Sequence, residues 1–166
     1  MPKASIPFSA FVEAAGVEHT DFINSFHEYM TEQDCKAEIK EAANGYVVSY
    51  VHKPSKRTVA NYVFRKEGLI MRMYADNVAS YMEILEKWPD SMKEKVQKAG
   101  TCKRTLNPEE CNARCIGSFD FILDGERRQP CRYNGLMFVL NDETKPYVRG
   151  MMEREIEARK NGLTEK

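Results

Sequence analysis

The sequence predicts an α+β fold in which an antiparallel sheet is flanked by helices, and three observations support this class. Apolar and polar residues alternate with a period of two through residues 36–75, and turn residues separate the runs. Segments on both sides of this region carry apolar residues at helical spacing. Asp124-Gly125 is a strong signal for a two-residue hairpin turn. We therefore expect a meander plus a C-terminal hairpin, with helices and a cysteine-rich loop around them.

The N-terminal half is expected to place helices before the meander. Residues 5–32 predict two helices: Pro7 suits the first turn of the first and Gly16 its end, and the second begins near Thr20. The meander at 36–75 follows. Its strands are expected at 37–41, 46–52, 58–65 and 69–74.

The C-terminal half is expected to mix helices with a second group of strands. Residues 77–99 predict two helices that Pro89 separates. The segment 100–134 contains most of the cysteines and the hairpin, and 135–160 holds a strand and a final helix. No repeat or linker interrupts the chain, so one α+β domain over 1–166 is the simplest organisation.

The composition limits the classes of function. Because 25 basic residues balance 25 acidic ones, the chain has no general attraction to nucleic acid or to an anionic membrane. No stretch reaches the roughly 18 apolar residues that cross a bilayer, and Glu13 interrupts the apolar run that a signal peptide needs. We expect a cytoplasmic protein, in a reducing compartment where cysteines bind metal or act in redox chemistry rather than form disulfides.

Four of the five cysteines are close together in the sequence. Cys102, Cys111, Cys115 and Cys131 follow the spacing C-x8-C-x3-C-x15-C. Zinc favours four tetrahedral ligands, often thiolates, and the x3 gap falls within the usual range for ligands on one loop. Cations beside these cysteines, such as Lys103 and Arg132, would offset the negative charge of a four-thiolate centre. The pattern predicts a structural Zn²⁺ that staples a long loop.

Other interpretations of the cysteines remain open. They could be small buried apolar residues, or disulfides in an exported protein, or redox-active thiols whose pKa the flanking cations lower. Cys35 stands apart and is expected to be the one freely reactive thiol beside a zinc-bound set. A catalytic zinc is not supported, because all three histidines lie far upstream of the cysteines.

The meander offers a candidate ligand-binding face. Arg72 and Tyr74 are expected to share a strand face that could accept an anionic small molecule, with Tyr62 nearby. A solvated or salt-bridged arginine is the favoured explanation of Arg72. The aromatic and basic residues of the meander could also stack nucleic-acid bases, although charged strand ends that keep a sheet edge soluble account for them.

No catalytic residues emerge from the sequence, which contains neither a phosphate-binding glycine loop nor a nucleophile elbow nor HExxH. The leading hypothesis is a zinc-stabilised binding module whose partner is an unknown small molecule, a protein or, less favoured, a nucleic acid. One alternative is a thiol-based redox sensor or enzyme that uses the clustered cysteines. Another is an enzyme of unknown reaction with its site on the sheet face near Arg72.

Three motifs resemble a group of uncharacterised small proteins from anaerobic bacteria. They are CKR at 102–104, CNARC at 111–115 and CRYNGLMFVL at 131–140. Members of that group carry a CKR…CNxxC…CRY pattern after an antiparallel meander and a helix. The resemblance implies that the cysteines act as a set in a bacterial protein, and it implies no activity.

Overall fold

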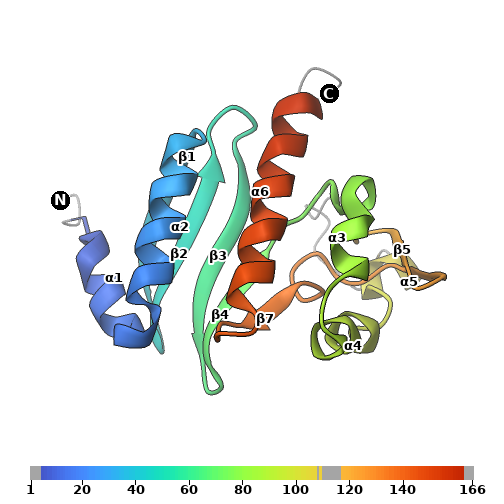
Figure 1. Cartoon of the computed structure of the whole chain (residues 1–166), viewed down its shortest axis with the longest axis horizontal. Coiled ribbons are helices and arrows are strands. Elements are labelled where there is room, and N and C mark those ends of the chain that lie inside the picture. Colours follow the sequence, from blue (N-terminus) through green and yellow to red (C-terminus); the bar gives the residue numbers. More distant parts are fainter. Residues whose placement is uncertain (1–4, 108, 110–116, 163–166) are drawn as a thin grey trace.

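The computed structural model describes residues 5–107, 109 and 117–162. A five-stranded antiparallel sheet with the order β1-β2-β3-β4-β7 forms its centre, and a separate two-stranded sheet pairs β5 with β6. Helices cover the large sheet (Figure 1). The α+β class predicted from the sequence is therefore confirmed.

The N-terminal helices form as the sequence predicts. They are α1 (Phe8–Ala15), a 3-10 turn η1 (Val17–His19) and α2 (Thr20–Glu32). Gly16 ends α1 at a φ of +104°, a conformation that residues with a Cβ rarely adopt. The chain thereby reverses, and α2 follows α1 at once.

The strands of the large sheet align in rows of facing residues that run from β2 to β7. Their bounds are β1 (Cys35–Ala42), β2 (Gly45–His52), β3 (Arg57–Arg65), β4 (Gly68–Met73) and β7 (Met137–Val139). One row contains Val48, Tyr62, Met71 and Phe138, and the row beside it contains Ser49, Asn61, Arg72 and Met137. Since neighbouring rows point to opposite faces, Tyr62 and Arg72 lie on opposite sides of the sheet.

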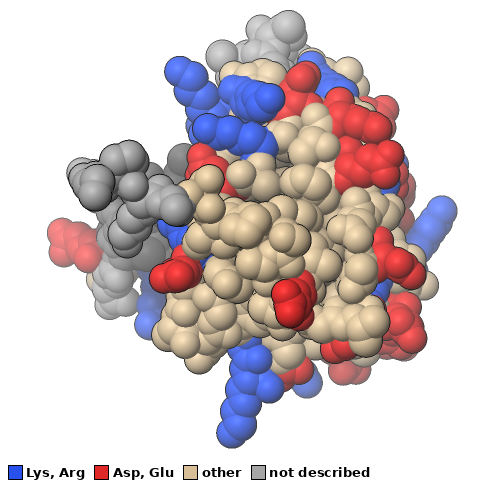
Figure 2. Space-filling view, turned by 90° about the vertical axis from the view of Figure 1, so that its left-hand side faces the viewer, with Lys and Arg blue, Asp and Glu red and all other residues tan. Residues whose placement is uncertain are grey.

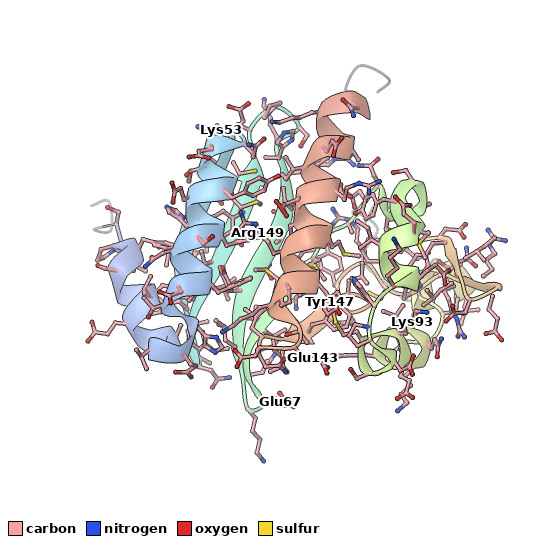
Figure 3. All side chains as sticks on the ribbon, in the orientation of Figure 1. Lys53, Glu67, Lys93, Glu143, Tyr147 and Arg149 are labelled. Atoms are coloured by element: carbon pink, nitrogen blue, oxygen red, sulfur yellow. The ribbon has the colours of Figure 1, made fainter. Side chains whose placement is uncertain are left out.

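The face that carries Tyr62 packs against helices. Figure 1 shows α2 and α6 (Lys145–Gly162) side by side in front of the strands. The Phe26 ring lies 5.4 Å from the ring of Tyr50 and 6.1 Å from that of Tyr62, in edge-on contacts. Arg149 on α6 points toward α2 (Figure 3), where its Nη1 donates to Ser25 Oγ at 3.0 Å.

A long excursion separates β4 from β7. It contains η2 (Val78–Tyr81), α3 (Met82–Glu86), α4 (Asp90–Lys98), α5 (Lys103–Leu106), β5 (Phe121–Leu123) and β6 (Glu126–Arg128). The helix predicted from residue 77 is thus a 3-10 turn followed by a short helix. The excursion packs beside α6, on the side away from α2 (Figure 1).

The predicted hairpin turn at Asp124-Gly125 is confirmed. Both residues have positive φ, 50° and 83°, as a two-residue type I′ turn requires. The hairpin does not join the large sheet. It is bound to α4 instead, where Lys93 Nζ lies 3.1 Å from a carboxylate oxygen of Asp124.

None of the helices in the described part of the chain is long and apolar enough to cross a membrane.

Candidate functional site

The structure places two of the four clustered cysteines, and Cys111 and Cys115 lie outside the described residues. The backbone N–H of Cys102 donates to the carbonyl of Gln129 at 2.8 Å. Cys102 therefore lies against the segment that leads into Cys131, although 28 residues separate the two in the sequence. Folding brings the first and last cysteines of the cluster to one region.

Both of these cysteines begin a tight turn. The carbonyl of Cys102 accepts the N–H of Thr105 at 3.1 Å, and the carbonyl of Cys131 accepts the N–H of Gly135 at 2.7 Å. A Cβ added to Gly135 would lie 2.8 Å from the Cys131 carbonyl oxygen and 2.8 Å from Pro130 Cβ. Only glycine allows so close an approach, so the turn itself requires the glycine of the CRYNG motif.

The environments of the two thiols differ. Cys102 is buried, whereas Cys131 is half-buried and its Sγ lies 3.9 Å from the side-chain nitrogen of Asn134. Across the described residues, no group of three or more His, Cys, Asp or Glu side chains has an arrangement suited to a metal ion. Thiols are ligands that zinc accepts, and Cys102 and Cys131 are the two clustered cysteines that the structure describes.

Cys35 is not the reactive thiol that the sequence predicts. It begins β1 opposite His52 and is 2% exposed, because β1 starts two residues earlier than expected and faces α2. Burial raises the pKa of the Cys35 thiol to about 11. The thiolate, which is the reacting form, is therefore scarce at neutral pH, and the prediction of free reactivity is wrong.

The predicted ligand-binding residues separate into two groups. Tyr62 is fully buried on the helix-covered face, with its ring 4.9 Å from that of Phe11. Arg72 lies on the opposite face, where its Nε donates to the carbonyl of Tyr133 at 2.7 Å. Tyr74 is buried with the Arg132 guanidinium 4.6 Å from its ring centre. Arg72 and Tyr74 thus hold residues 132–133 of the cysteine segment, and Tyr62 has no part in this.

A buried network of charged side chains was not predicted from the sequence. Glu155 is fully buried and accepts hydrogen bonds from Tyr81 Oη at 2.6 Å, the Asn77 backbone at 3.0 Å and side chain at 2.9 Å, and Arg159 Nε at 2.8 Å. Burial and the adjacent carboxylate raise the pKa of Tyr81 far above its usual value, so its hydroxyl remains a donor. One signal was available: Glu155 and Arg159 interrupt the apolar stripe of the C-terminal helix at an i, i+4 spacing.

The network continues from α6 to the cysteine segment. Arg159 Nη2 donates to Asp76 at 3.2 Å and to the carbonyl of Tyr74 at 2.8 Å. Asp76 also receives two hydrogen bonds from Arg132, at 2.8 and 3.1 Å. The guanidinium of Arg132, expected to offset thiolate charge, is therefore bound by Asp76. The carboxylate of Asp76 thus links Arg132, the residue after Cys131, to Arg159 on α6.

A cleft of about 220 Å³ opens beside this network. Its lining includes Arg57, Asp76, Ser118, Phe119, Asp120 and Arg132. Polar groups of both charges therefore surround a small space between the start of β3 and the cysteine segment, and this cleft is the candidate functional site.

A second surface is apolar. Figure 2, which looks at the molecule from the side of α1, shows a broad central area with few charged side chains. An open cleft of about 520 Å³ on α1 and α2 includes Phe8, Val12 and Val17 in its lining, and Val17 is 88% exposed. Among the described residues, the same lining contains one charged side chain, that of Glu13.

Comparison of the chain with protein-family models, with curated proteins and with solved structures gave no match. The functional inference therefore depends on the residues themselves.

Proposed function

We propose that this protein is a binding module whose cysteine segment is closed by a structural Zn²⁺ held by Cys102, Cys111, Cys115 and Cys131. The observation that carries the proposal is the 2.8 Å backbone hydrogen bond from Cys102 to Gln129, which brings the two ends of the cysteine pattern together. The CKR…CNxxC…CRY pattern resembles that of a group of small proteins from anaerobic bacteria, and on this resemblance we treat the four thiols as one set. A four-thiolate site would persist in a reducing, cytoplasmic compartment.

A structural role for the metal follows from the ligand set. Catalytic zinc keeps an open position and works with a general base, whereas four thiolates fill the tetrahedron. A structural site of this kind can contribute on the order of 10 kcal/mol to folding. The excursion between β4 and β7 would gain from such a contribution, because the two strands of its hairpin are only three residues long each.

Metal content and thiol reactivity, measured on one sample, test the proposal. Elemental mass spectrometry of protein purified without chelator should find about one zinc per chain, since four thiolates make one tetrahedral site. Native alkylation should label none of the five cysteines rapidly, because four bind metal and Cys35 is buried with a raised pKa. After chelation, the four clustered cysteines should react while Cys35 stays slow for as long as the sheet remains folded.

The zinc content of cysteine variants distinguishes the proposed zinc ligands from Cys35, which is not a ligand. Cys102→Ser and Cys131→Ser should each lose zinc, and Cys35→Ala should retain it. A metal-free protein whose clustered thiols oxidise reversibly would instead favour the thiol-based redox sensor or enzyme. Retention of full zinc by both serine variants would contradict the assigned ligand set.

A further inference from the structure

We propose that the 220 Å³ cleft beside the buried network binds a small oxyanion, either a phosphate or a carboxylate, between Arg57 and Arg132. The inference names a ligand class for the binding module and in that sense rests on the proposed function, although no cysteine takes part. It assigns the anion site to a different place from the sheet face at Arg72.

Arg132 is fixed in the wall of this cleft. Its guanidinium is bound edge-on by Asp76 through Nε and Nη2, and its plane lies over the Tyr74 ring at 4.6 Å. The side chain is only 12% exposed. Neither bond to Asp76 uses Nη1, so a guanidinium that is already oriented still has a donor edge for a second oxyanion. Little side-chain entropy would be lost on binding.

The two carboxylates in the lining do not exclude an anion, because arginine side chains already bind both of them. Asp120 is bound at 2.9 and 2.6 Å by Arg127, and Asp76 is shared by Arg132 and Arg159. The network and the cleft together contain three carboxylates and four guanidinium groups. The carboxylates are those of Asp76, Asp120 and Glu155, and the guanidinium groups are those of Arg57, Arg127, Arg132 and Arg159. The surplus positive charge belongs to Arg57.

Arg57 is placed by the same network. It is the first residue of β3, and its carbonyl accepts Arg159 Nη1 at 3.2 Å, so its backbone is fixed against α6. Its side chain is exposed, and in the part of the chain that the structure describes its guanidinium pairs with no carboxylate. An exposed guanidinium whose backbone is already fixed can bind an anion through charge-assisted hydrogen bonds with little further loss of backbone entropy.

The rest of the lining fits a small oxyanion. Thr105 Oγ1 donates to Ser118 Oγ at 2.9 Å, which leaves the Ser118 hydroxyl proton to donate elsewhere. Val78 and Phe119 are buried and provide an apolar floor that lowers the local dielectric. The volume admits a phosphate or a short carboxylic acid and is too small for a nucleotide, since sites for drug-sized ligands start at about 300 Å³.

Isothermal titration of the purified protein, with its zinc content measured on the same sample, tests the inference, with inorganic phosphate and acetate as separate probes in a chloride buffer. At least one probe should bind saturably to a single site. Arg57→Gln should weaken that binding by about tenfold or more, because one charge-assisted contact is lost. Arg65→Gln is the matched control, since Arg65 is also exposed and lies at the other end of β3, and it should leave the affinity unchanged.

The two probes and the control make each outcome decisive. Binding of phosphate alone would identify a phosphoryl ligand, and binding of acetate alone a carboxylate. Absence of saturable binding for both probes, or equal weakening by Arg57→Gln and Arg65→Gln, would overturn the site. Zinc content on the same sample separates the two proposals: a zinc-loaded protein that binds no anion contradicts only this one, and a zinc-free protein that binds anion contradicts only the metal.

Discussion

At the residue scale, the feature that most constrains the molecule is the buried carboxylate of Glu155. A buried charge is tolerated only when it is paired and its hydrogen-bonding positions are filled. Glu155 meets both conditions, through Arg159 and through donors from Tyr81 and Asn77. The guanidinium of Arg159 in turn donates hydrogen bonds to two carbonyls of β3 and to Asp76. The pair therefore fixes α6 to the sheet and to the chain that leaves β4.

Glu155→Ala should destabilise the protein by about 3–5 kcal/mol, because it leaves Arg159 buried with one carboxylate fewer. Glu157→Ala, two residues further along α6 and exposed, should change the free energy of unfolding by no more than about 0.5 kcal/mol. Urea denaturation of both variants measures the difference. Similar effects of the two substitutions would mean that the buried network does not stabilise the fold.

At the element scale, the turn after Cys131 and the C-terminal helix use glycine in opposite ways. Gly135 sits where a Cβ would collide with the Cys131 carbonyl and with Pro130. Gly150 lies inside α6, and a Cβ added there would meet nothing within 4 Å, so this glycine adds only backbone entropy to the unfolded chain. The first glycine is a steric requirement of the cysteine segment, and the second weakens its helix.

The same substitution at these two glycines should therefore have effects of opposite sign. Gly135→Ala should lower the free energy of unfolding by about 1–3 kcal/mol through overpacking. Gly150→Ala should raise it by about 0.5–1 kcal/mol, because alanine is the better helix former. Chemical denaturation of the two variants, beside the parent protein, gives both values. A stabilised Gly135→Ala would show that the turn can open without loss.

At the scale of the whole molecule, the excursion between β4 and β7 is tied to the sheet at several points. Asp76 binds arginines from the cysteine segment and from α6. Trp88, which follows α3, packs edge-on against Phe138 of β7 with ring centres 5.3 Å apart. β7 itself returns the chain to the edge of the large sheet. These contacts couple the excursion to the core.

Unfolding of the excursion and of the sheet should consequently be one transition. Trp88 is the sole tryptophan of the chain, so its fluorescence reports the excursion, while far-ultraviolet circular dichroism reports strands and helices throughout. The two signals should give coincident urea curves. A fluorescence change at clearly lower urea than the dichroism change would show that the excursion opens separately.

The fold class was predictable because its signals are local. The period-two runs of the meander correspond to β1 to β4, and Asp124-Gly125 supplies the positive φ values that its turn needs. The predictions from the sequence were wrong where they depended on which face of the sheet a side chain occupies or on which residue it contacts. Cys35 looked isolated and reactive, yet one strand register turns it toward α2. Tyr62 and Arg72 looked like neighbours, yet pairing of β3 with β4 sends them to opposite faces.

The sequence by itself determined most of the helices and strands, the hairpin turn and the cysteine pattern, since each depends on periodicity or on turn chemistry within a few residues. Only the tertiary structure decided which charges meet. Asp76 and Arg159 lie 83 residues apart, and Asp76 and Arg132 lie 56 apart. No local pattern encodes such pairs, because they form only when packing removes α6, the end of β4 and the cysteine segment from water together.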